Sequence, residues 1–312
     1  MNLSDVVDEY VAHKRALGMD FTTEVRILSA FCHSTRNVSM DAITTDQVQR
    51  YLDGDTPVSS YWQRKRTVLA GLYRFVLSRG YAHSSPLPCR GPQLPPPLVP
   101  YIYSKAELKR LLDATPGACG PRVPMEAYVF RTLILLLYGA CLRLGEAIRL
   151  TMTDVDLDQA VLSIRETKFH KTRLVPLGHD LSLVLNQYVQ RRCITHGKEP
   201  TAPFFCFRDG RTLSQSAVQS AFRRLRAQAG IQRSDGGRYQ PRLHDLRHTG
   251  AVHRLVAWYR SGADLQRLLP QLATYLGHID LAATQRYLTL TPELLHEASM
   301  RFERYSKETH HD

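Results

Sequence analysis

The segment from Thr132 to Leu142 constrains the fold most, because it is strongly apolar and carries no charge over 11 residues. A transmembrane helix needs about 20 residues, so this run predicts a helix buried inside a globular domain. Arg143 follows immediately. Its guanidinium has to be paired or solvated, since burying it alone is costly. One interpretation is a solvated ion pair with Glu146 at a helix end. The other places Arg143 in a functional site.

The composition is that of a cytoplasmic globular protein. A chain of 312 residues is long enough for two domains with separate cores. The six cysteines are widely spaced and form no C-x-x-C pair, which predicts reduced thiols and neither a disulfide framework nor a zinc site. The first residues lack the basic and apolar regions of a secretion signal, so we expect a cytoplasmic protein.

The charge distribution indicates a nucleic-acid partner. The net charge is +12 and the isoelectric point about 9.6. Residues 1–55 have a net charge of −4, residues 56–106 carry 7 basic residues and no acid, and residues 191–247 have a net charge of +8. Charge segregated in this way predicts a phosphate-binding surface. A membrane surface fits less well, because no basic amphipathic tail is present.

Residues 1–83 predict a small helical domain, since apolar positions recur there at helical spacing. One helix is expected to begin near Ser60, to bury Tyr61 and to end at Gly80. It presents basic residues that are candidates for DNA-phosphate contact, although an ordinary solvated helix face is the alternative: Arg64, Lys65 and Arg66. A proline-rich linker follows at residues 84–103.

Residues 104–312 predict a second domain that is mainly α-helical and holds a small antiparallel β-sheet. Ser104 and Glu107 form a capping box at its start. Strand patterns occur near 155–157, 161–165 and 172–176, with a basic hairpin tip between the last two. Helices are expected near 181–192, 214–229, 244–259, 264–275, 281–287 and 292–306.

Three later motifs give Arg143 a chemical context: His244-Asp-Leu-Arg247-His248, Leu276-Gly277-His278 and Thr284-Gln-Arg-Tyr287. Arginine forks can hold a phosphodiester and neutralise the charge of its transition state. A tyrosine hydroxyl can act as covalent nucleophile, and a lysine can protonate the departing oxygen. Histidines can donate hydrogen bonds to phosphate oxygens. The set indicates metal-free phosphoryl transfer through a phosphotyrosine.

These residues resemble the tyrosine recombinases, the phage-integrase and Xer-type family, over residues 104–300. Arg143 matches the motif G-x-x-L-R-x-G/S-E, and the segment Lys171-Thr-Arg173-Leu-Val-Pro-Leu177 matches K-x-R-x-V-P-L behind the hairpin lysine. The resemblance implies six catalytic residues: Arg143, Lys168, His244, Arg247, His278 and the nucleophile Tyr287. Lys171 competes with Lys168 for the catalytic role. Glu146 and His248 are expected to support the site, and Lys171 and Arg173 to contact DNA.

The resemblance implies a site-specific recombinase with a mainly helical fold and a mixed α/β catalytic domain. Its N-terminal domain would be a core-binding domain for double-stranded DNA with specific sites. No metal or cofactor would be needed. Four protomers, or a mixed tetramer with a related recombinase, would exchange strands through a Holliday junction. Residues 292–306 would dock on a neighbouring protomer, or else pack on their own domain.

Three further interpretations concern the biological role. The long aromatic segment 257–270 favours a mobile element, serving integration, excision or transposition. A type IB topoisomerase would use a similar set of residues. A DNA-binding accessory protein without catalysis is the alternative from another class.

Overall fold

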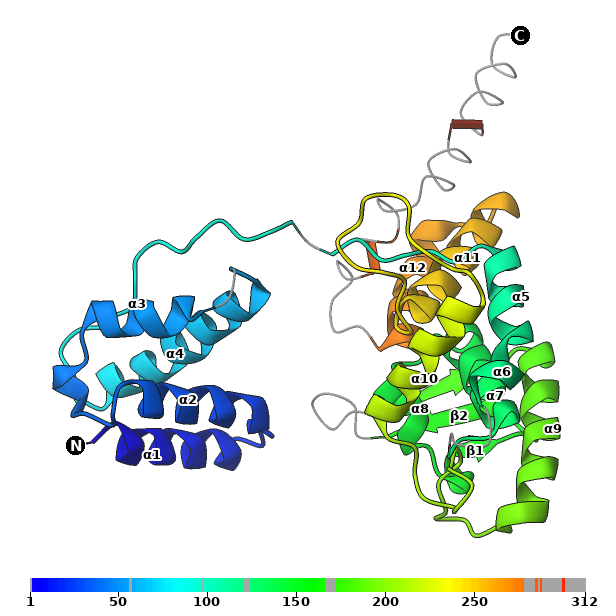
Figure 1. Ribbon diagram of the computed structural model, residues 1–312, viewed down its shortest axis with the longest axis horizontal. Coiled ribbons are helices and arrows are strands. Elements are labelled where there is room, and N and C mark those ends of the chain that lie inside the picture. Colours follow the sequence, from blue (N-terminus) through cyan, green and yellow to red (C-terminus); the bar gives the residue numbers. More distant parts are fainter. Residues whose placement is uncertain are drawn as a thin grey trace. The chain divides into compact units, whose positions relative to one another are not determined.

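The computed structural model describes residues 2–55, 58–96, 98–119, 124–165 and 172–277, together with 284, 285, 287, 299 and 300. The chain divides into two compact units, Met1–Pro97 and Leu98–Asp312 (Figure 1). The division lies inside the segment 84–103, for which a linker is predicted. Every helix in the described part of the chain is too short or too polar to cross a lipid bilayer.

The N-terminal unit consists of helices packed on one apolar core. They are α1 (Leu3–Ala16), α2 (Thr22–Ser34), α3 (Thr45–Asp53) and α4 (Ser60–Ser78), with a short 3-10 helix at Met40–Ala42. Helix α4 contacts the other three α-helices. A capping box at Thr44 and Gln47 starts α3. Helix α4 is followed by Gly80 at φ +72°, a left-handed conformation that suits a helix end.

Helix α4 turns a different face to the core than predicted, because Trp62 and not Tyr61 is buried. Tyr61 is 53% exposed, whereas Trp62 is buried and donates from Nε1 to Asp53 at 2.9 Å. The core-facing stripe runs at helical spacing from Trp62 through Lys65 to Leu69 and Leu72. Lys65 is therefore buried on this stripe, and the prediction that it lies on an exposed basic face was wrong.

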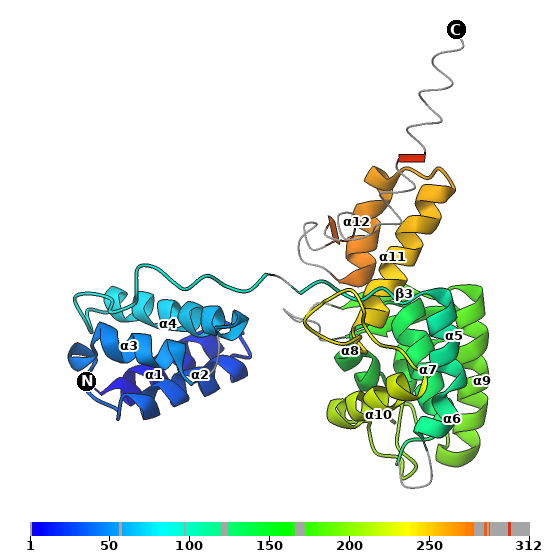
Figure 2. The ribbon, with the colours of Figure 1, turned by 45° about the horizontal axis from the view of Figure 1, so that its top comes forward.

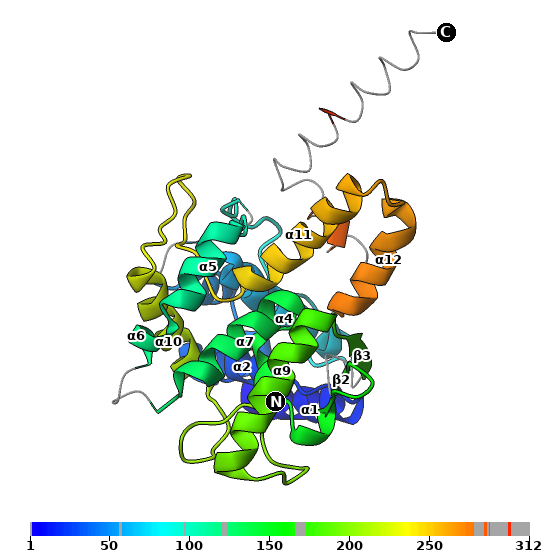
Figure 3. The ribbon, with the colours of Figure 1, turned by 90° about the vertical axis from the view of Figure 1, so that its right-hand side faces the viewer.

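The C-terminal unit is built around α7 (Ala127–Gly139), which contains most of the predicted apolar run. Helices α6, α9 and α11 pack against it (Figures 1 and 3). The other helices have these bounds: α5 (Lys105–Asp113), α6 (Thr115–Ala118), α8 (Leu144–Arg149), the 3-10 helix Met152–Asp154, α9 (His179–His196), α10 (Gln215–Gln228), α11 (Asp245–Arg260) and α12 (Leu265–Leu276). The helices predicted near 181–192, 214–229, 244–259 and 264–275 are confirmed.

The sheet is small and antiparallel, as predicted. Strands β1 (Val155–Asp156), β2 (Val161–Ile164) and β3 (Arg173–Pro176) lie in the order β1-β2-β3. Leu162 pairs with Val175, and Ile164 pairs with Arg173. The apolar members of these pairs are buried, which fixes the face of the sheet that packs on the core. Strand β3 also contacts α12. The predicted hairpin tip lies outside the described residues.

Helix α11 crosses the end of α7 with its backbone in close contact. A Cβ atom at Gly250 would overlap the carbonyl oxygen of Tyr138 and would lie 2.7 Å from Sγ of Cys141. Only glycine fits such an approach. The crossing brings the first turn of α11 to the segment between α7 and α8.

Helix α12 lies beside α11 and is followed by its C-cap residue Gly277, which has φ +65° (Figure 2). Residues 284, 285 and 287 are helical, within the helix predicted near 281–287. Apart from 299 and 300, the segment predicted as a helix at 292–306 lies outside the described residues.

Candidate active site

Arg143 is the N-cap residue of α8 and lies in the short segment that follows the buried α7. Its backbone N–H donates to Oε2 of Glu146 at 2.9 Å, and its Nη1 donates to Oε1 at 2.8 Å. Its Nη2 donates to the carbonyl of Gly277 at 3.2 Å. The side chain is still 42% exposed. Arg143 is therefore held from one side and open to solvent on the other.

Glu146 is a buried carboxylate that joins several guanidinium groups. Arg173 donates to both of its oxygens at 3.0 and 2.9 Å, and Nη1 of Arg247 lies 3.9 Å from Oε2. Burial alone would raise the pKa of Glu146. Hydrogen bonds and charge from Arg173 and Arg143 outweigh burial and lower that pKa to about 2. The predicted ion pair between Arg143 and Glu146 is thus present, but the carboxylate of Glu146 is buried and not solvated.

Arg247 is almost completely buried, with 2% of its surface exposed. Its Nη1 donates to the carbonyl of Cys141 and its Nη2 to the carbonyl of Leu276, both at 2.6 Å. It therefore joins the segment after α7 to the end of α12. Burial, followed by the charge of Arg143, lowers the pKa of Arg247 to about 10, so it remains cationic at neutral pH.

Tyr287 lies with its hydroxyl inside this cluster. The side chain is 4% exposed and packs among apolar residues of α11 and α12, including Val252 and Leu276. Its Oη lies 2.9 Å from Nδ1 of His248. Burial raises the pKa of Tyr287, and the charge of Arg247 partly opposes that rise.

Two histidines lie one turn apart at the start of α11. His244 is the residue before the helix, and its ring meets the ring of His248 edge to face at 4.8 Å. Desolvation by the protein around the ring, together with Arg247 and Arg242, lowers the pKa of His244. His244 keeps an exposed surface. The neutral imidazole is thus favoured at a surface that a phosphate could reach.

The structure brings most of the predicted catalytic residues together. Arg143, Arg247, His244 and Tyr287 converge where α7, α8, α11 and α12 meet, with Glu146 and His248 between them. Lys168, Lys171 and His278 lie outside the described residues. Within the part of the chain that is described, no group of His, Cys, Asp or Glu could hold a metal ion.

Arg173 is not the exposed DNA contact that the sequence predicted. Its side chain is 10% exposed, and besides pairing with Glu146 it donates from Nε to the carbonyl of Tyr275 at 3.1 Å. A Cβ atom at Gly277 would lie 2.8 Å from its Nη1. Strand β3 directs this arginine inward because Arg173 pairs with Ile164, whose side chain is buried. Arg173 therefore joins Glu146 of α8 to the end of α12.

The basic residues of α4 also have protein partners. Nζ of Lys65 donates to the carbonyl of Tyr51 at 2.6 Å and lies 4.9 Å from the centre of that tyrosine's ring. Arg64 is half exposed and pairs with Glu24 at 2.6 Å. Arg66 donates to the carbonyl of Pro88 at 3.3 Å. Of the three, Arg64 has the charged group most open to a partner.

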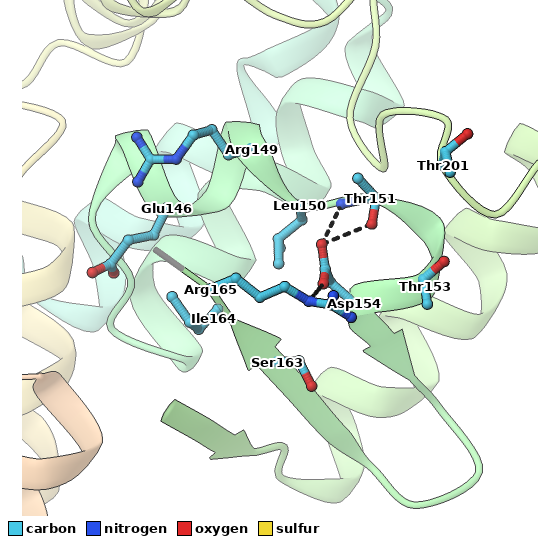
Figure 4. A pocket seen from close by; sticks show the side chains of 10 residues that line it. All are labelled: Glu146, Arg149, Leu150, Thr151, Thr153, Asp154, Ser163, Ile164, Arg165 and Thr201. Atoms are coloured by element: carbon cyan, nitrogen blue, oxygen red, sulfur yellow. Dashed lines mark hydrogen bonds and ion pairs between the residues drawn. The ribbon is translucent and has the colours of Figure 1, made fainter. Parts of the chain in front are cut away.

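A groove of about 450 Å³ is lined by residues of α8 and β2 (Figure 4). Arg149 and Arg165 lie along it, and Glu146 is the site residue that lines it. Asp154 accepts hydrogen bonds from the backbone and hydroxyl of Thr151 at 2.9 and 2.7 Å and pairs with Arg165 at 2.6 Å. The groove therefore adjoins the cluster, but it does not contain Tyr287.

Comparison with known proteins identifies the family to which the chain belongs. The model of the phage integrase family matches residues 103–293, which include every element of this site. The chain belongs to the phage integrase family. This integrase is 37% identical to the putative integrase/recombinase y4rB of Sinorhizobium fredii, over 96% of each chain. It is 32% identical to the tyrosine recombinase XerC of Chlorobaculum tepidum, over 75% of this chain and 70% of the relative.

Solved structures show the same fold. The integrase aligns with the Tn1549 transposon integrase in complex with transposon right end DNA, with a TM-score of 0.70 and 13% identity, over 98% of this chain and 100% of the other. It aligns with a lambda integrase dimer bound to a COC′ core site with a TM-score of 0.65 and 16% identity, over 91% and 97% of the chains. The expected family and fold class are confirmed, and the integrase is a tyrosine recombinase.

Proposed function

We propose that this tyrosine recombinase cleaves and rejoins DNA at specific sites through a phosphotyrosine at Tyr287. The observation that carries the proposal is the position of the Tyr287 hydroxyl beside Arg247 and His248, in a cluster shared with Arg143. The hydroxyl oxygen attacks phosphorus, and the bond to the 5′-oxygen breaks. The new phosphotyrosine keeps the free energy of the phosphodiester, so rejoining needs no nucleotide cofactor.

Each arginine has a role that follows from its surroundings. Arg143 is partly exposed and can donate to a bound phosphate from its open side, while Glu146 fixes the other side. Arg247 supplies a buried positive charge next to the attacking oxygen, where low dielectric strengthens its effect on the transition state. We assign His244 and His278 to hydrogen bonds with the non-bridging oxygens and Lys168 to protonation of the 5′-oxygen.

DNA affinity would come from the basic surfaces of both units. Arg64, Arg66 and Lys171 are our candidates for phosphate contact, together with the exposed basic residues of the stretch 191–247. The DNA complexes among the structural neighbours support a duplex as partner, and we propose that the protein acts on it in the cytoplasm. Lys65 and Arg173 are excluded from this set, because both are buried and paired within the protein.

A nicked suicide duplex tests the chemistry, because the cleaved fragment diffuses away and leaves the covalent adduct. The binding site would first be selected from a pool of random duplexes. Wild-type protein should form an adduct, and Tyr287→Phe should form none while binding the duplex with similar affinity. Tyr275→Phe is the matched control, since its hydroxyl makes long contacts of 3.4 and 3.5 Å to backbone carbonyls. An adduct with Tyr287→Phe would exclude this nucleophile.

The biological role that we propose is the movement of a mobile element by a tetramer, formed by this chain alone or with a related recombinase. The Tn1549 transposon integrase among the structural neighbours supports the mobile-element role. A lambda integrase tetramer bound to a Holliday junction, a structural neighbour with a TM-score of 0.66, supports the tetramer. Recombination between paired sites, compared with relaxation of a site-free supercoiled plasmid, distinguishes this role from that of a topoisomerase. Binding to the selected site without cleavage would indicate an accessory protein.

Assembly is tested by truncation after Thr291. If residues 292–306 dock on a neighbouring protomer, the shortened chain should bind a single site normally but lose cooperative binding and recombination. Recombination at the wild-type rate would contradict docking between protomers. A shortened chain that fails to fold would favour packing of this segment on its own domain.

A further inference from the structure

His248 makes a contact that the family's six expected catalytic residues do not account for. It follows Arg247 in α11, and its Nδ1 lies 2.9 Å from the hydroxyl oxygen of Tyr287. The two rings are 5.5 Å apart and tilted by 55°. Thus an imidazole nitrogen lies within hydrogen-bond distance of the hydroxyl oxygen that we propose as nucleophile.

The attacking hydroxyl needs a group that can take its proton. Tyr287 is 4% exposed, and burial raises its pKa, so a free phenolate is disfavoured. A neutral phenol is a weak nucleophile unless an adjacent base activates it. The neighbouring Arg247 stabilises negative charge on the oxygen, but a guanidinium has no site that can accept a proton. A neutral imidazole can accept it.

We infer that His248 is a catalytic residue that accepts the proton of the Tyr287 hydroxyl as this oxygen attacks phosphorus. The inference rests on the proposed function. The O–H bond of Tyr287 breaks and its proton binds to Nδ1, while the oxygen forms its bond to phosphorus and the bond from phosphorus to the 5′-oxygen breaks. Lys168 supplies the proton for that leaving oxygen. In rejoining, His248 returns its proton to Tyr287.

The position of His248 on α11 suits this role. His244, one turn earlier, keeps an exposed surface toward which a phosphate can bind, and its ring supports that of His248 at 4.8 Å. The crossing at Gly250 fixes this turn of the helix against α7. The ring of His244 and the close packing of α11 on α7 therefore hold the imidazole of His248 in position.

The same helix offers a matched control. Nδ1 of His253 also lies 2.9 Å from a tyrosine hydroxyl, that of Tyr138, and the rings are 5.8 Å apart. This pair has the same chemistry as His248 and Tyr287, but it contains no proposed nucleophile. A variant at His253 thus removes a comparable hydrogen bond without touching the reaction.

The experiment measures the single-turnover rate of adduct formation on the nicked duplex, with the full-length protein. His248→Ala should slow this rate by about 10²-fold or more, the usual contribution of a general base. Added imidazole should restore part of it. His248→Asn should remain slow, because an amide oxygen accepts a hydrogen bond but takes no proton. His253→Ala should cleave at nearly the wild-type rate.

The outcomes separate the two proposals. Wild-type rates for folded His248→Ala or His248→Asn would overturn the role of His248 as proton acceptor, and a fast Asn variant would leave it a positioning residue. No adduct with wild-type protein would overturn both proposals. Thermal unfolding and duplex binding are measured for each variant; if the Ala variant does not fold, the Asn variant decides.

Discussion

Arg173 and Glu146 form a buried ion pair with two parallel hydrogen bonds, at 3.0 and 2.9 Å. The pair joins β3 to α8, and a third hydrogen bond from Arg173 to the carbonyl of Tyr275 extends the connection to α12. Because Glu146 also binds Arg143, the orientation of this arginine, for which we propose a catalytic role, depends on strand β3.

The first prediction concerns acid stability. The pKa of Glu146 is lowered from 4.5 to about 2, so its carboxylate stabilises the folded protein fully above pH 4.5 and loses that effect as the pH falls toward 2. The shift corresponds to about 3 kcal/mol. In urea unfolding, Glu146→Gln should be less stable than wild type at pH 7, and the difference should shrink below pH 4.5. Parallel pH profiles would contradict the buried pair.

The second prediction separates Arg143 from Arg247, the two arginines that we propose to be catalytic. Arg143→Lys should unfold nearly as wild type, because the side chain is 42% exposed, but should cleave more slowly by a factor on the order of 10²–10³. Arg247→Lys should lose both cleavage and stability, since one ammonium cannot reach the carbonyls of Cys141 and Leu276 together. Adduct rates and urea midpoints are compared. Equal stability for the two variants would show that the hydrogen bonds of Arg247 are dispensable.

The third prediction concerns Gly277. Alanine at this left-handed residue costs about 1–2 kcal/mol of backbone strain and also displaces the guanidinium of Arg173. Gly230→Ala, at φ +62° with open space around it, is the control for strain alone. Gly277→Ala should therefore be less stable than Gly230→Ala and should cleave more slowly. Equal losses in thermal unfolding would mean that the contact with Arg173 contributes nothing.

The fourth prediction distinguishes Lys65 from Arg64. Lys65→Ala should destabilise the protein by about 1–3 kcal/mol, because the carbonyl of Tyr51 loses its buried donor. Its duplex affinity should be unchanged. Arg64→Ala should have little effect on unfolding but should weaken binding and lower the slope of log K against log salt by about 0.9. Binding isotherms at several salt concentrations test both; a reduced slope for Lys65→Ala would show that Lys65 reaches DNA.

The fifth prediction concerns the leaving oxygen. A duplex with sulfur at the 5′-bridging position has a leaving group that needs no protonation, so it should restore cleavage to Lys168→Ala. It should not restore Tyr287→Phe, which lacks the nucleophile. Lys171→Ala is the comparison. Rescue of Lys171→Ala without rescue of Lys168→Ala would transfer the role to Lys171.

The elements that sequence patterns predicted well depend on local interactions. The capping box at Ser104 begins a helix as expected, and the strand patterns predicted the small sheet. Arg143, Arg247 and Tyr287 were identified by motif, and their proximity follows from the packing of α7, α11 and α12. Local spacing and known motifs were sufficient for these features.

Burial of basic side chains could not be predicted in the same way. Arg192 contributes to the positive charge of the stretch 191–247, yet it is 1% exposed and donates to the carbonyls of Phe204, Gly197 and Pro203. Lys65 likewise occupies a core-facing position of α4. Carbonyl groups from elsewhere in the chain satisfy both charges, and their positions are set by tertiary structure. The contact between His248 and Tyr287 also depends on tertiary structure, because 39 residues separate the two in the sequence.

The close crossing at Gly250 has a consequence for how far the protein can vary. Two main chains in contact leave no side chain whose exchange could widen the gap between α7 and α11. The distance between the segment that carries Arg143 and the turn that carries Arg247 is thus independent of the volumes of the surrounding leucines and valines. We expect the apolar interior to accept many substitutions while the two guanidinium groups keep their separation.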